Sequence, residues 1–143
     1  MTVKALLSAK GGDVTTIEPT KNVAAAAQLL AEHKIGSLVI TGPDRRVIGI
    51  LSERDIVQAI ARHGAAALEI SLTEVMTRKV VTCGPSDTIS SIMERMTAGK
   101  FRHVPVVEQG RLTGIVSSGD VVKHRLNEME HEHAALRDYI QTA

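Results

Sequence analysis

The sequence predicts a mixed α/β (α+β) protein built from two copies of one β-α-β-β-α unit and extended by a long C-terminal helix. Two observations support this prediction. The segments GILSERD (residues 49–55) and GIVSSGD (residues 114–120) share the form Gly-apolar-apolar-Ser-x-x-Asp and lie 65 residues apart. Upstream, VTTIEP (residues 14–19) resembles VVTCGP (residues 80–85), 66 residues apart. Two motifs repeated in the same order at nearly the same spacing indicate a duplicated structural unit.

The first unit, residues 13–63, follows a short lead-in of residues 1–12. A β-branched strand at residues 14–17 ends before Pro19, which cannot continue a hydrogen-bonded ladder. Residues 22–33 are rich in alanine, and their apolar positions follow the 3.6-residue period of an amphipathic helix. The remaining predicted elements are a strand at 37–41, a turn at 42–44, a strand at 47–51 and a helix at 52–62.

The second unit, residues 80–126, repeats this order after a connector at residues 64–79. Asp87 and Thr88 are good N-cap residues for its first helix, because their side chains can accept hydrogen bonds from the first helical turn. The predicted elements are a strand at 80–83, a helix at 88–98, a strand at 103–107, a turn at 108–110, a strand at 112–116 and a helix that begins at Ser118.

The last helix continues as a C-terminal extension, residues 127–143. Six of its residues recur at alternating spacings of four and three, the pattern of a heptad seam: Val122, Leu126, Met129, His133, Leu136 and Ile140. Such a seam has to be buried, and two interpretations stay open. The helix packs against its own domain, or it pairs with the same helix of a second chain. The polar His133 weakens the second interpretation.

Composition excludes several classes of protein. The formal net charge of +1 and the scarcity of aromatic rings, Phe101 and Tyr139, argue against nucleic-acid binding. No apolar run approaches the roughly 20 residues that span a bilayer, and we do not expect residues 1–12 to be a signal peptide, because their apolar run is very short. Cys83, the single cysteine, excludes an intramolecular disulfide. We therefore expect a soluble cytoplasmic protein.

The repeated Ser-x-x-Asp segment has a structural and a functional interpretation. Serine before a helix, with an acid three residues later, resembles a capping box, and a cap stabilises a helix by about 1 kcal/mol without any ligand. The same junction presents free backbone N–H groups and the positive end of the helix dipole, which favour phosphate. An aspartate one turn into the helix can accept hydrogen bonds from both hydroxyls of a ribose. Because the segment occurs twice at equivalent places, we favour a nucleotide site.

Together the two units resemble a tandem pair of cystathionine-β-synthase-type domains (CBS domains). The resemblance rests on both Gly-apolar-apolar-Ser-x-x-Asp segments, on EVMT (residues 74–77) and on FRHVPV (residues 101–106), and covers about residues 13–126. SERD (residues 52–55) and RHVPV (residues 102–106) are similar to small stand-alone bacterial members. The resemblance implies two repeats packed sheet to sheet about a pseudo-two-fold axis, two clefts between them, and a homodimer of such pairs.

The resemblance also implies a non-enzymatic regulatory module whose clefts bind adenosine-containing ligands such as AMP, ADP, ATP, NAD(H) or S-adenosylmethionine. Carried over by position, Asp55 and Asp120 would hold ribose, and Ser52 and Ser117 would lie near phosphate. Thr16 and Thr82, with the residues just after them, would meet adenine through backbone groups. The other residues expected at the clefts are Ile35, Gly36, Ser37, Arg54, Cys83, Arg102, His103, Val104, Pro105 and Ser118.

The two clefts are not expected to be equal. Gly36-Ser37 stands where the second unit has Arg102-His103, so we expect weaker phosphate binding at the first-unit site and a stronger grip at Asp120. The resemblance also implies that the repeats interlock, so that the basic side chains of one repeat can serve the site of the other.

Other functions have less support. An enzyme would need an activated nucleophile, a metal cage or a Walker-type phosphate loop, and the sequence offers none of them. Cys83 ends a predicted buried strand, so we interpret it as an inert core residue. His124, Glu128 and His131 share a helix face, which we interpret as solvated rather than metal-binding. A dimeric interaction scaffold with vestigial clefts remains the alternative to a ligand sensor.

Overall fold

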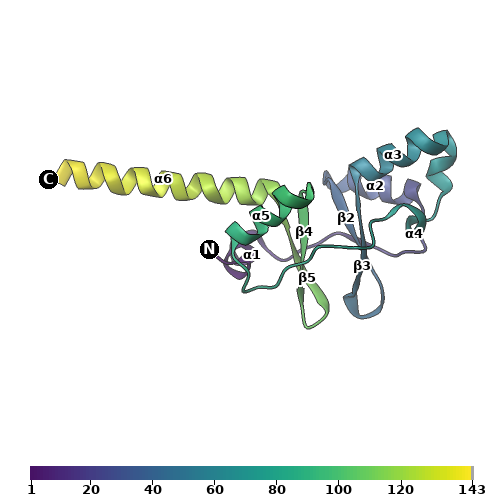
Figure 1. Cartoon of the computed structure of the whole chain (residues 1–143), viewed down its shortest axis with the longest axis horizontal. Coiled ribbons are helices and arrows are strands. Elements are labelled where there is room, and N and C mark those ends of the chain that lie inside the picture. Colours follow the sequence, from purple (N-terminus) through teal and green to yellow (C-terminus); the bar gives the residue numbers. More distant parts are fainter. Residues whose placement is uncertain (143) are drawn as a thin grey trace.

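In the computed structural model, which describes residues 1–142, two α/β units lie side by side and α6 (Ser118–Thr142) projects away from them (Figure 1). The first unit holds a sheet in the order β1 (Thr16–Ile17), β2 (Ser37–Thr41), β3 (Val47–Ser52), with the short helix η1 (Pro43–Arg45) in the turn before β3. β1 runs parallel to β2, and β3 runs antiparallel to it. The mixed α/β fold with a C-terminal helix confirms the predicted fold class.

Two helices pack on one face of the first sheet, α2 (Val23–His33) and α3 (Glu53–His63). Asn22 caps α2 by accepting a hydrogen bond from the backbone of Ala25 at 2.9 Å. Alternation along β2 directs Leu38 and Ile40 into the core beneath these helices. The helix η2 (Gly64–Glu69) then leads from α3 into the connector.

The second unit repeats this arrangement with an antiparallel pair of strands, β4 (His103–Glu108) and β5 (Arg111–Ser117), and with α5 (Ile89–Gly99). Thr88 caps α5, as expected. The predicted strand at residues 80–83 is wrong in its extent, because only Cys83 pairs with the sheet, as a bridge to Val106. Thr77 pairs instead with β3 of the first unit, so the chain crosses from one sheet to the other within a few residues.

The two sheets face each other. On β2, Val39 alternates with the residues that pack beneath the helices, yet it is fully buried. Pro105 holds the corresponding position on β4 and is also buried. The edges are joined as well, since Arg45 Nε donates to the carbonyl of Leu112 at 3.1 Å. Both faces of each sheet are therefore covered, one by helices and one by the other unit.

Each unit receives a helix from the segment that precedes the other unit. The helix α1 (Val3–Lys10), in residues where the sequence predicts no helix, buries Val3 and Leu6 in the core of the second unit. The helix α4 (Leu72–Val75), in the connector, buries Leu72 in the core of the first unit. Each segment therefore packs on the unit that it does not precede, and we call this arrangement the exchange of segments.

Matched backbone hydrogen bonds fix this exchange. Ile89 N at the start of α5 donates to Met1 O at 3.0 Å, and Val23 N at the start of α2 donates to Ile70 O at 3.0 Å. The segments before α1 and α4 therefore meet equivalent helix N-termini in opposite units. This pseudo-symmetry was not visible in the sequence, where residues 1–12 and 64–79 show no obvious likeness.

The exchange also explains the glycine that opens each repeated motif. A Cβ atom on Gly114 would lie 2.7 Å from Leu7 Cδ1 of α1. A Cβ atom on Gly49 would lie 2.5 Å from Met76 Sδ, just after α4. Both distances are far below van der Waals contact, so only glycine lets the crossing segment lie directly on the strand.

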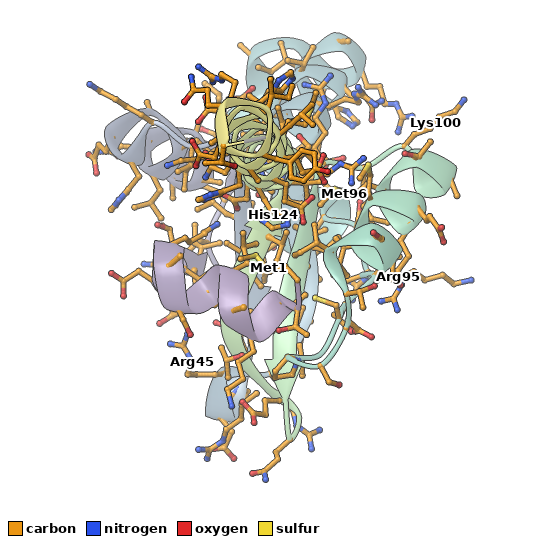
Figure 2. All side chains as sticks on the ribbon, turned by 90° about the vertical axis from the view of Figure 1, so that its left-hand side faces the viewer. Met1, Arg45, Arg95, Met96, Lys100 and His124 are labelled. Carbon is orange, nitrogen blue, oxygen red and sulfur yellow. The ribbon has the colours of Figure 1, made fainter. Side chains whose placement is uncertain are left out.

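The start of α6 packs on the second unit through Val121, which is buried. In the view along α6, His124 lies on the side of the helix that faces the rest of the molecule (Figure 2). From residue 129 to residue 142 every residue of the helix is exposed. Within residues 1–142 none of the helices, α6 included, combines the length and apolar character that crossing a bilayer requires.

Candidate functional site

Both Ser-x-x-Asp segments form helix caps. Ser52 N donates to Asp55 Oδ2 at 2.8 Å, and Asp55 N donates to Ser52 Oγ at 3.3 Å. Ser117 N donates to Asp120 Oδ2 at 2.8 Å, and Asp120 N donates to Ser117 Oγ at 3.1 Å. The structural interpretation of the motif is therefore correct for both copies. It leaves a functional role open, because each carboxylate has a second oxygen.

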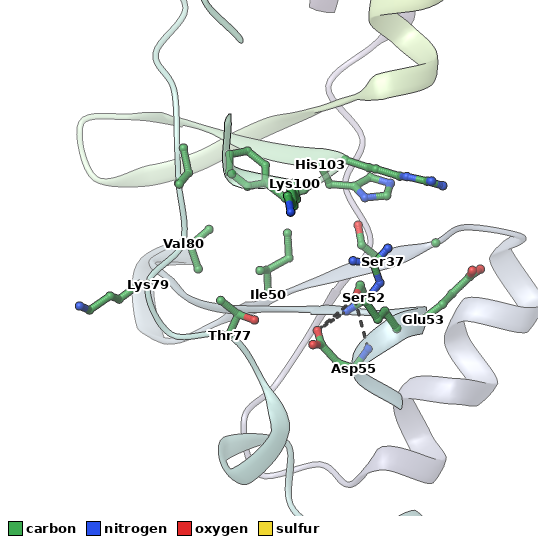
Figure 3. A pocket seen from close by; sticks show the side chains of 16 residues that line it. Ser37, Ile50, Ser52, Glu53, Asp55, Thr77, Lys79, Val80, Lys100 and His103 are labelled. Carbon is green, nitrogen blue, oxygen red and sulfur yellow. Dashed lines mark hydrogen bonds between the residues drawn. The ribbon is translucent and has the colours of Figure 1, made fainter. Parts of the chain in front are cut away.

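The two copies differ in what surrounds the acid. Asp55 lies in the wall of a cavity of about 720 Å³ between the two units (Figure 3). The cavity is lined by three groups of residues: the start of β2 with the end of β3 and the start of α3, the connector, and the segment from the end of α5 to the start of β4. These groups are Gly36, Ser37, Ile50, Ser52, Glu53, Arg54 and Asp55; Thr77, Lys79, Val80 and Val81; and Gly99, Lys100, Phe101, Arg102 and His103.

The structure brings together seven of the residues that the sequence places at the clefts: Gly36, Ser37, Ser52, Arg54, Asp55, Arg102 and His103. Nine others lie outside this cavity: Thr16, Ile35, Thr82, Cys83, Val104, Pro105, Ser117, Ser118 and Asp120. The expected advantage of the Asp120 site rested on Arg102 and His103. Because the repeats interlock, these two side chains line the cavity of the other acid.

Sequence reasoning assigned no role to the connector residues that line the cavity, Thr77, Lys79, Val80 and Val81, or to Lys100. Thr77 ends the EVMT segment, which was a family signal without an assigned function. Thr77 reaches the cavity because it pairs with Ile50 of β3, with hydrogen bonds of 3.0 and 2.9 Å. A pairing between segments so far apart leaves no local pattern in the sequence.

Ser37 is the most informative residue of the cavity wall. It begins β2 opposite Ser52 of β3 and is only 6% exposed. Its hydroxyl has no hydrogen-bond partner within residues 1–142. A buried hydroxyl that is left unpaired costs about 1–3 kcal/mol, so such groups are rare and demand a reason. Figure 3 shows Ser37 between Ser52 and His103, where the ends of strands from the two sheets come together.

Positive charge predominates around the cavity. Four cationic side chains line it, from Arg54, Lys79, Lys100 and Arg102, whereas the acids on the lining are Glu53 and Asp55. The hydrogen bonds that the Asp55 carboxylate accepts within its helix cap, from the backbone and the hydroxyl of Ser52, both end on Oδ2, at 2.8 and 3.1 Å. Its other oxygen can therefore accept hydrogen bonds from a ligand.

His103 lies within electrostatic range of charged groups around both Ser-x-x-Asp segments, Asp120 with Lys10 and Glu53. Burial lowers the pKa of His103 below its ordinary value, and the charges of Lys10 and Arg102 lower it further, against the opposing effect of Asp120 and Glu53. The imidazole is therefore neutral at pH 7 and can donate one hydrogen bond and accept another. Its Cε1 lies 3.5 Å from the position that a Cβ atom on Gly36 would take, an ordinary van der Waals distance that places the ring beside the start of β2.

Asp120 is occupied by the protein itself. Lys10, at the end of α1, forms an ion pair with Asp120 Oδ2 and donates a second hydrogen bond to Ile115 O at 2.8 Å. Burial alone would raise the pKa of Asp120, but hydrogen bonds from Lys10 and from the backbone and hydroxyl of Ser117 outweigh it and lower the pKa. The carboxylate is therefore charged and paired at neutral pH.

Cys83 behaves as a core residue. It is buried among the apolar side chains of the second unit, with backbone hydrogen bonds to both neighbours of Val106. Burial raises the pKa of its thiol to about 11, with a further contribution from Asp87. A thiol that stays protonated at neutral pH is a poor nucleophile. Cys83 does not line the cavity beside Asp55, and its expected place near a nucleotide at the second-unit site stays a prediction.

On the helix face of His124 and Glu128, a hydrogen bond joins His124 Nε2 and Glu128 Oε1, which lie 2.9 Å apart. Across the part of the chain that the structure describes, no three His, Cys, Asp or Glu side chains gather closely enough to hold a metal ion.

Comparison with known proteins agrees with this architecture. The CBS domain family model matches residues 3–62 and 72–127, one match for each unit. A CBS-domain containing protein from Agrobacterium tumefaciens, of known structure, is 51% identical to this chain. The two superpose with a TM-score of 0.84, covering 87% of this chain and 99% of that one.

Two more distant relatives extend the comparison. The CBS domain pair of protein MJ0100, solved in complex with 5′-methylthioadenosine and S-adenosyl-L-methionine, is 26% identical with a TM-score of 0.80, over 90% of this chain and 98% of that one. The mitochondrial CBS domain-containing protein CBSX3 of Arabidopsis thaliana is 32% identical over 120 residues. That match covers 81% of this chain but 58% of the plant protein. The duplicated fold and the paired family match together show that this chain belongs to the CBS-domain family, as a tandem pair of CBS domains.

Proposed function

We propose that the protein is a non-enzymatic regulatory module that binds an adenosine-containing nucleotide in the cavity beside Asp55. The observation that carries the proposal is the Asp55 carboxylate on the cavity wall, whose second oxygen is left free by the helix cap and which four cationic side chains accompany.

The size and lining of the cavity suit a nucleotide. Small-molecule sites usually enclose about 300–1,000 Å³ and combine apolar walls with a few polar groups. Here Ile50, Val80, Val81 and Phe101 supply apolar surface for a base. The free oxygen of Asp55 would accept hydrogen bonds from the ribose hydroxyls, which are worth about 1.5–3 kcal/mol each when the acceptor is charged.

Charge favours ligands that carry phosphate. With four cationic side chains against two acids on the lining, AMP, ADP, ATP or NAD(H) fits better than a ligand with a positive sulfonium. Protein MJ0100 was solved with two adenosine compounds that lack phosphate, so the family fold itself does not decide this point. The preference for a phosphorylated ligand rests on the positive charge that lines the cavity of this chain.

We further propose that one chain binds one ligand. At the second site Lys10 pairs with the acid and donates to the Ile115 carbonyl, so a ribose at Asp120 would have to compete with this cation. CBS domains generally regulate rather than catalyse, and the output here is a change in assembly or in affinity for a partner protein. A single reduced cysteine suits the cytoplasm as the working compartment.

Thermal unfolding in the presence of AMP, ATP, NADH and S-adenosylmethionine tests the proposal. A ligand at about 100 times its Kd stabilises the folded state by about 2.7 kcal/mol, which raises the melting temperature by several degrees. We expect a phosphorylated adenosine compound to give the largest shift. Guanosine and cytidine nucleotides serve as matched controls. No shift with any adenosine compound would contradict the proposal and favour a scaffold whose clefts are vestigial.

A further inference from the structure

The apolar seam of α6 faces solvent. Val122 and Leu126 are 57% and 55% exposed, although they lie in the part of the helix that packs on the second unit. The contact with that unit is made by the opposite side of the helix, through Val121 and His124. The seam therefore does not pack against its own domain, and that interpretation of the heptad pattern is wrong.

Among the described residues, no other element covers the outer part of α6. Residues 129–142 are exposed on every side, and the seam continues through them as Met129, His133, Leu136 and Ile140. An isolated helix of about 12–15 residues is marginally stable in water. An apolar seam of this length on a protruding helix indicates that another helix covers it.

We propose that the covering helix is α6 of a second copy of this chain, in a parallel two-stranded coiled coil. The seam residues occupy heptad positions a (126, 133, 140) and d (122, 129, 136), which places Arg125 and Glu132 at g and Glu130 and Arg137 at e. In a parallel pair, each g residue lies beside the e residue of the next heptad on the other helix. Arg125 then meets Glu130, and Glu132 meets Arg137, so both contacts are attractive.

The same charges make an antiparallel pair of helices unfavourable. When the helices run in opposite directions, e faces e and g faces g across the seam. Glu130 would face Glu130 of the second copy, Glu132 would face Glu132, and Lys123 would face Arg137. All three contacts are repulsive, so the flanking charges select the parallel orientation.

Two features of the single chain are compatible with this pairing. Arg125 lies 3.6 Å from Glu128 on its own helix, but such an exposed pair contributes at most about 1 kcal/mol and can exchange for an interchain contact. His133 occupies a central a position, where a polar residue fixes register and strand number while lowering stability. His133, which weakened the dimer interpretation, thus helps to align the two helices.

Analytical ultracentrifugation of the full chain over a range of concentrations, without ligand, tests the pairing. We expect a reversible dimer that Leu136→Glu weakens more than about tenfold, because a charge enters the apolar seam. Ala135→Glu adds the same charge outside the seam and should leave the dimer intact. A wild-type chain that stays monomeric, or a Leu136→Glu chain that dimerises like the wild type, would overturn the proposal.

Orientation needs its own test. In a parallel coil the two copies of residue 136 face each other, so Leu136→Cys should form an interchain disulfide on mild oxidation, while the wild type, whose cysteine is buried, should not. Glu132→Arg should weaken the dimer, and adding Arg137→Glu should restore it. Failure of both the disulfide and the charge exchange would overturn the parallel arrangement. Loss of nucleotide binding would leave this proposal unaffected, since the coil lies outside the cavity.

Discussion

The ammonium group of Lys10 forms an ion pair with the carboxylate of Asp120, which lies 110 residues later in the chain. The contact depends on the exchange of segments, since α1 packs on the second unit and its last residue reaches the second copy of the motif. Within residues 1–142 no cation forms an ion pair with Asp55 of the first copy, and this acid lines an open cavity. One pair of residues thus gives two nearly identical sequence motifs different electrostatic surroundings.

Replacing Lys10 by Met should raise the pKa of Asp120 toward its ordinary value. The hydrogen bonds from Ser117 remain and continue to lower it, so the return is incomplete. Carboxyl chemical shifts in an NMR titration would report the change directly, with Asp55 as the internal control. An unchanged pKa of Asp120 in Lys10→Met would show that the ion pair does not form in solution.

The same ion pair gives a stability difference with a defined pH dependence. A carboxylate whose pKa is lower in the folded state stabilises that state above its unfolded pKa, and this stabilisation is lost as the pH falls through the folded value. The partly exposed pair contributes about 1 kcal/mol or less. Urea unfolding should therefore separate wild type from Lys10→Met at pH 7, with the two curves converging in strong acid.

Ser37→Ala and Ser52→Ala should change stability in opposite directions. Removing the unpaired Ser37 hydroxyl relieves a buried polar group, so the ligand-free protein should gain up to about 1 kcal/mol. Removing the Ser52 hydroxyl takes away a helix cap, which costs about 1 kcal/mol. Denaturant unfolding measures both. A loss of stability in Ser37→Ala would mean that the hydroxyl has a partner in the free protein.

Gly114→Ala should loosen α1 from the second unit. The new methyl group would meet Leu7 at 2.7 Å, and such overpacking typically costs about 1–3 kcal/mol. Faster amide hydrogen exchange across residues 3–10 is the expected signature. Shortening the opposing side chain, in Gly114→Ala combined with Leu7→Ala, should restore part of the protection. Unchanged exchange in the single variant would contradict the close crossing of α1 over β5.

The position of His103 predicts a loss of stability in mild acid. Its folded pKa lies below the unfolded value near 6.5, so the unfolded chain takes up the proton first as the pH falls. The free energy of unfolding should therefore decrease below about pH 6.5. His103→Gln, which cannot be protonated, should show a smaller decrease. Equal slopes for the two proteins would mean that His103 titrates normally.

The local elements follow from the sequence, and their long-range pairing does not. Residues 37–41 were predicted as a strand from β-branched composition, and β2 has those bounds; helix 52–62 was predicted from its serine cap, and α3 is shifted by one residue. By contrast, Val3 and Leu6 form too short an apolar pattern to predict a helix. Their burial depends on a core built from residues 83–121, which no local signal identifies.

The candidate site shows the same division. Ser52 and Asp55 emerge from the repeated motif, because a cap and an acid one turn apart are local features. The unpaired state of Ser37 and the approach of Thr77 and Lys100 require the folded molecule. The sequence associated Arg102 and His103 with Asp120 but left open that they serve the opposite site, and in the folded molecule they line the cavity beside Asp55. The sequence therefore predicted which kinds of side chain the site contains better than it predicted which residues line the cavity.

Isothermal titration calorimetry with the most stabilising adenosine nucleotide tests the central claim most directly. We predict one ligand per chain for the wild type, and binding at least about tenfold weaker in Asp55→Asn, because a charged acceptor is lost while the amide oxygen can keep the helix cap. Asp120→Asn, the matched change at the site that Lys10 occupies, should bind like the wild type. Wild-type affinity in Asp55→Asn together with lost affinity in Asp120→Asn would contradict the assignment of the site.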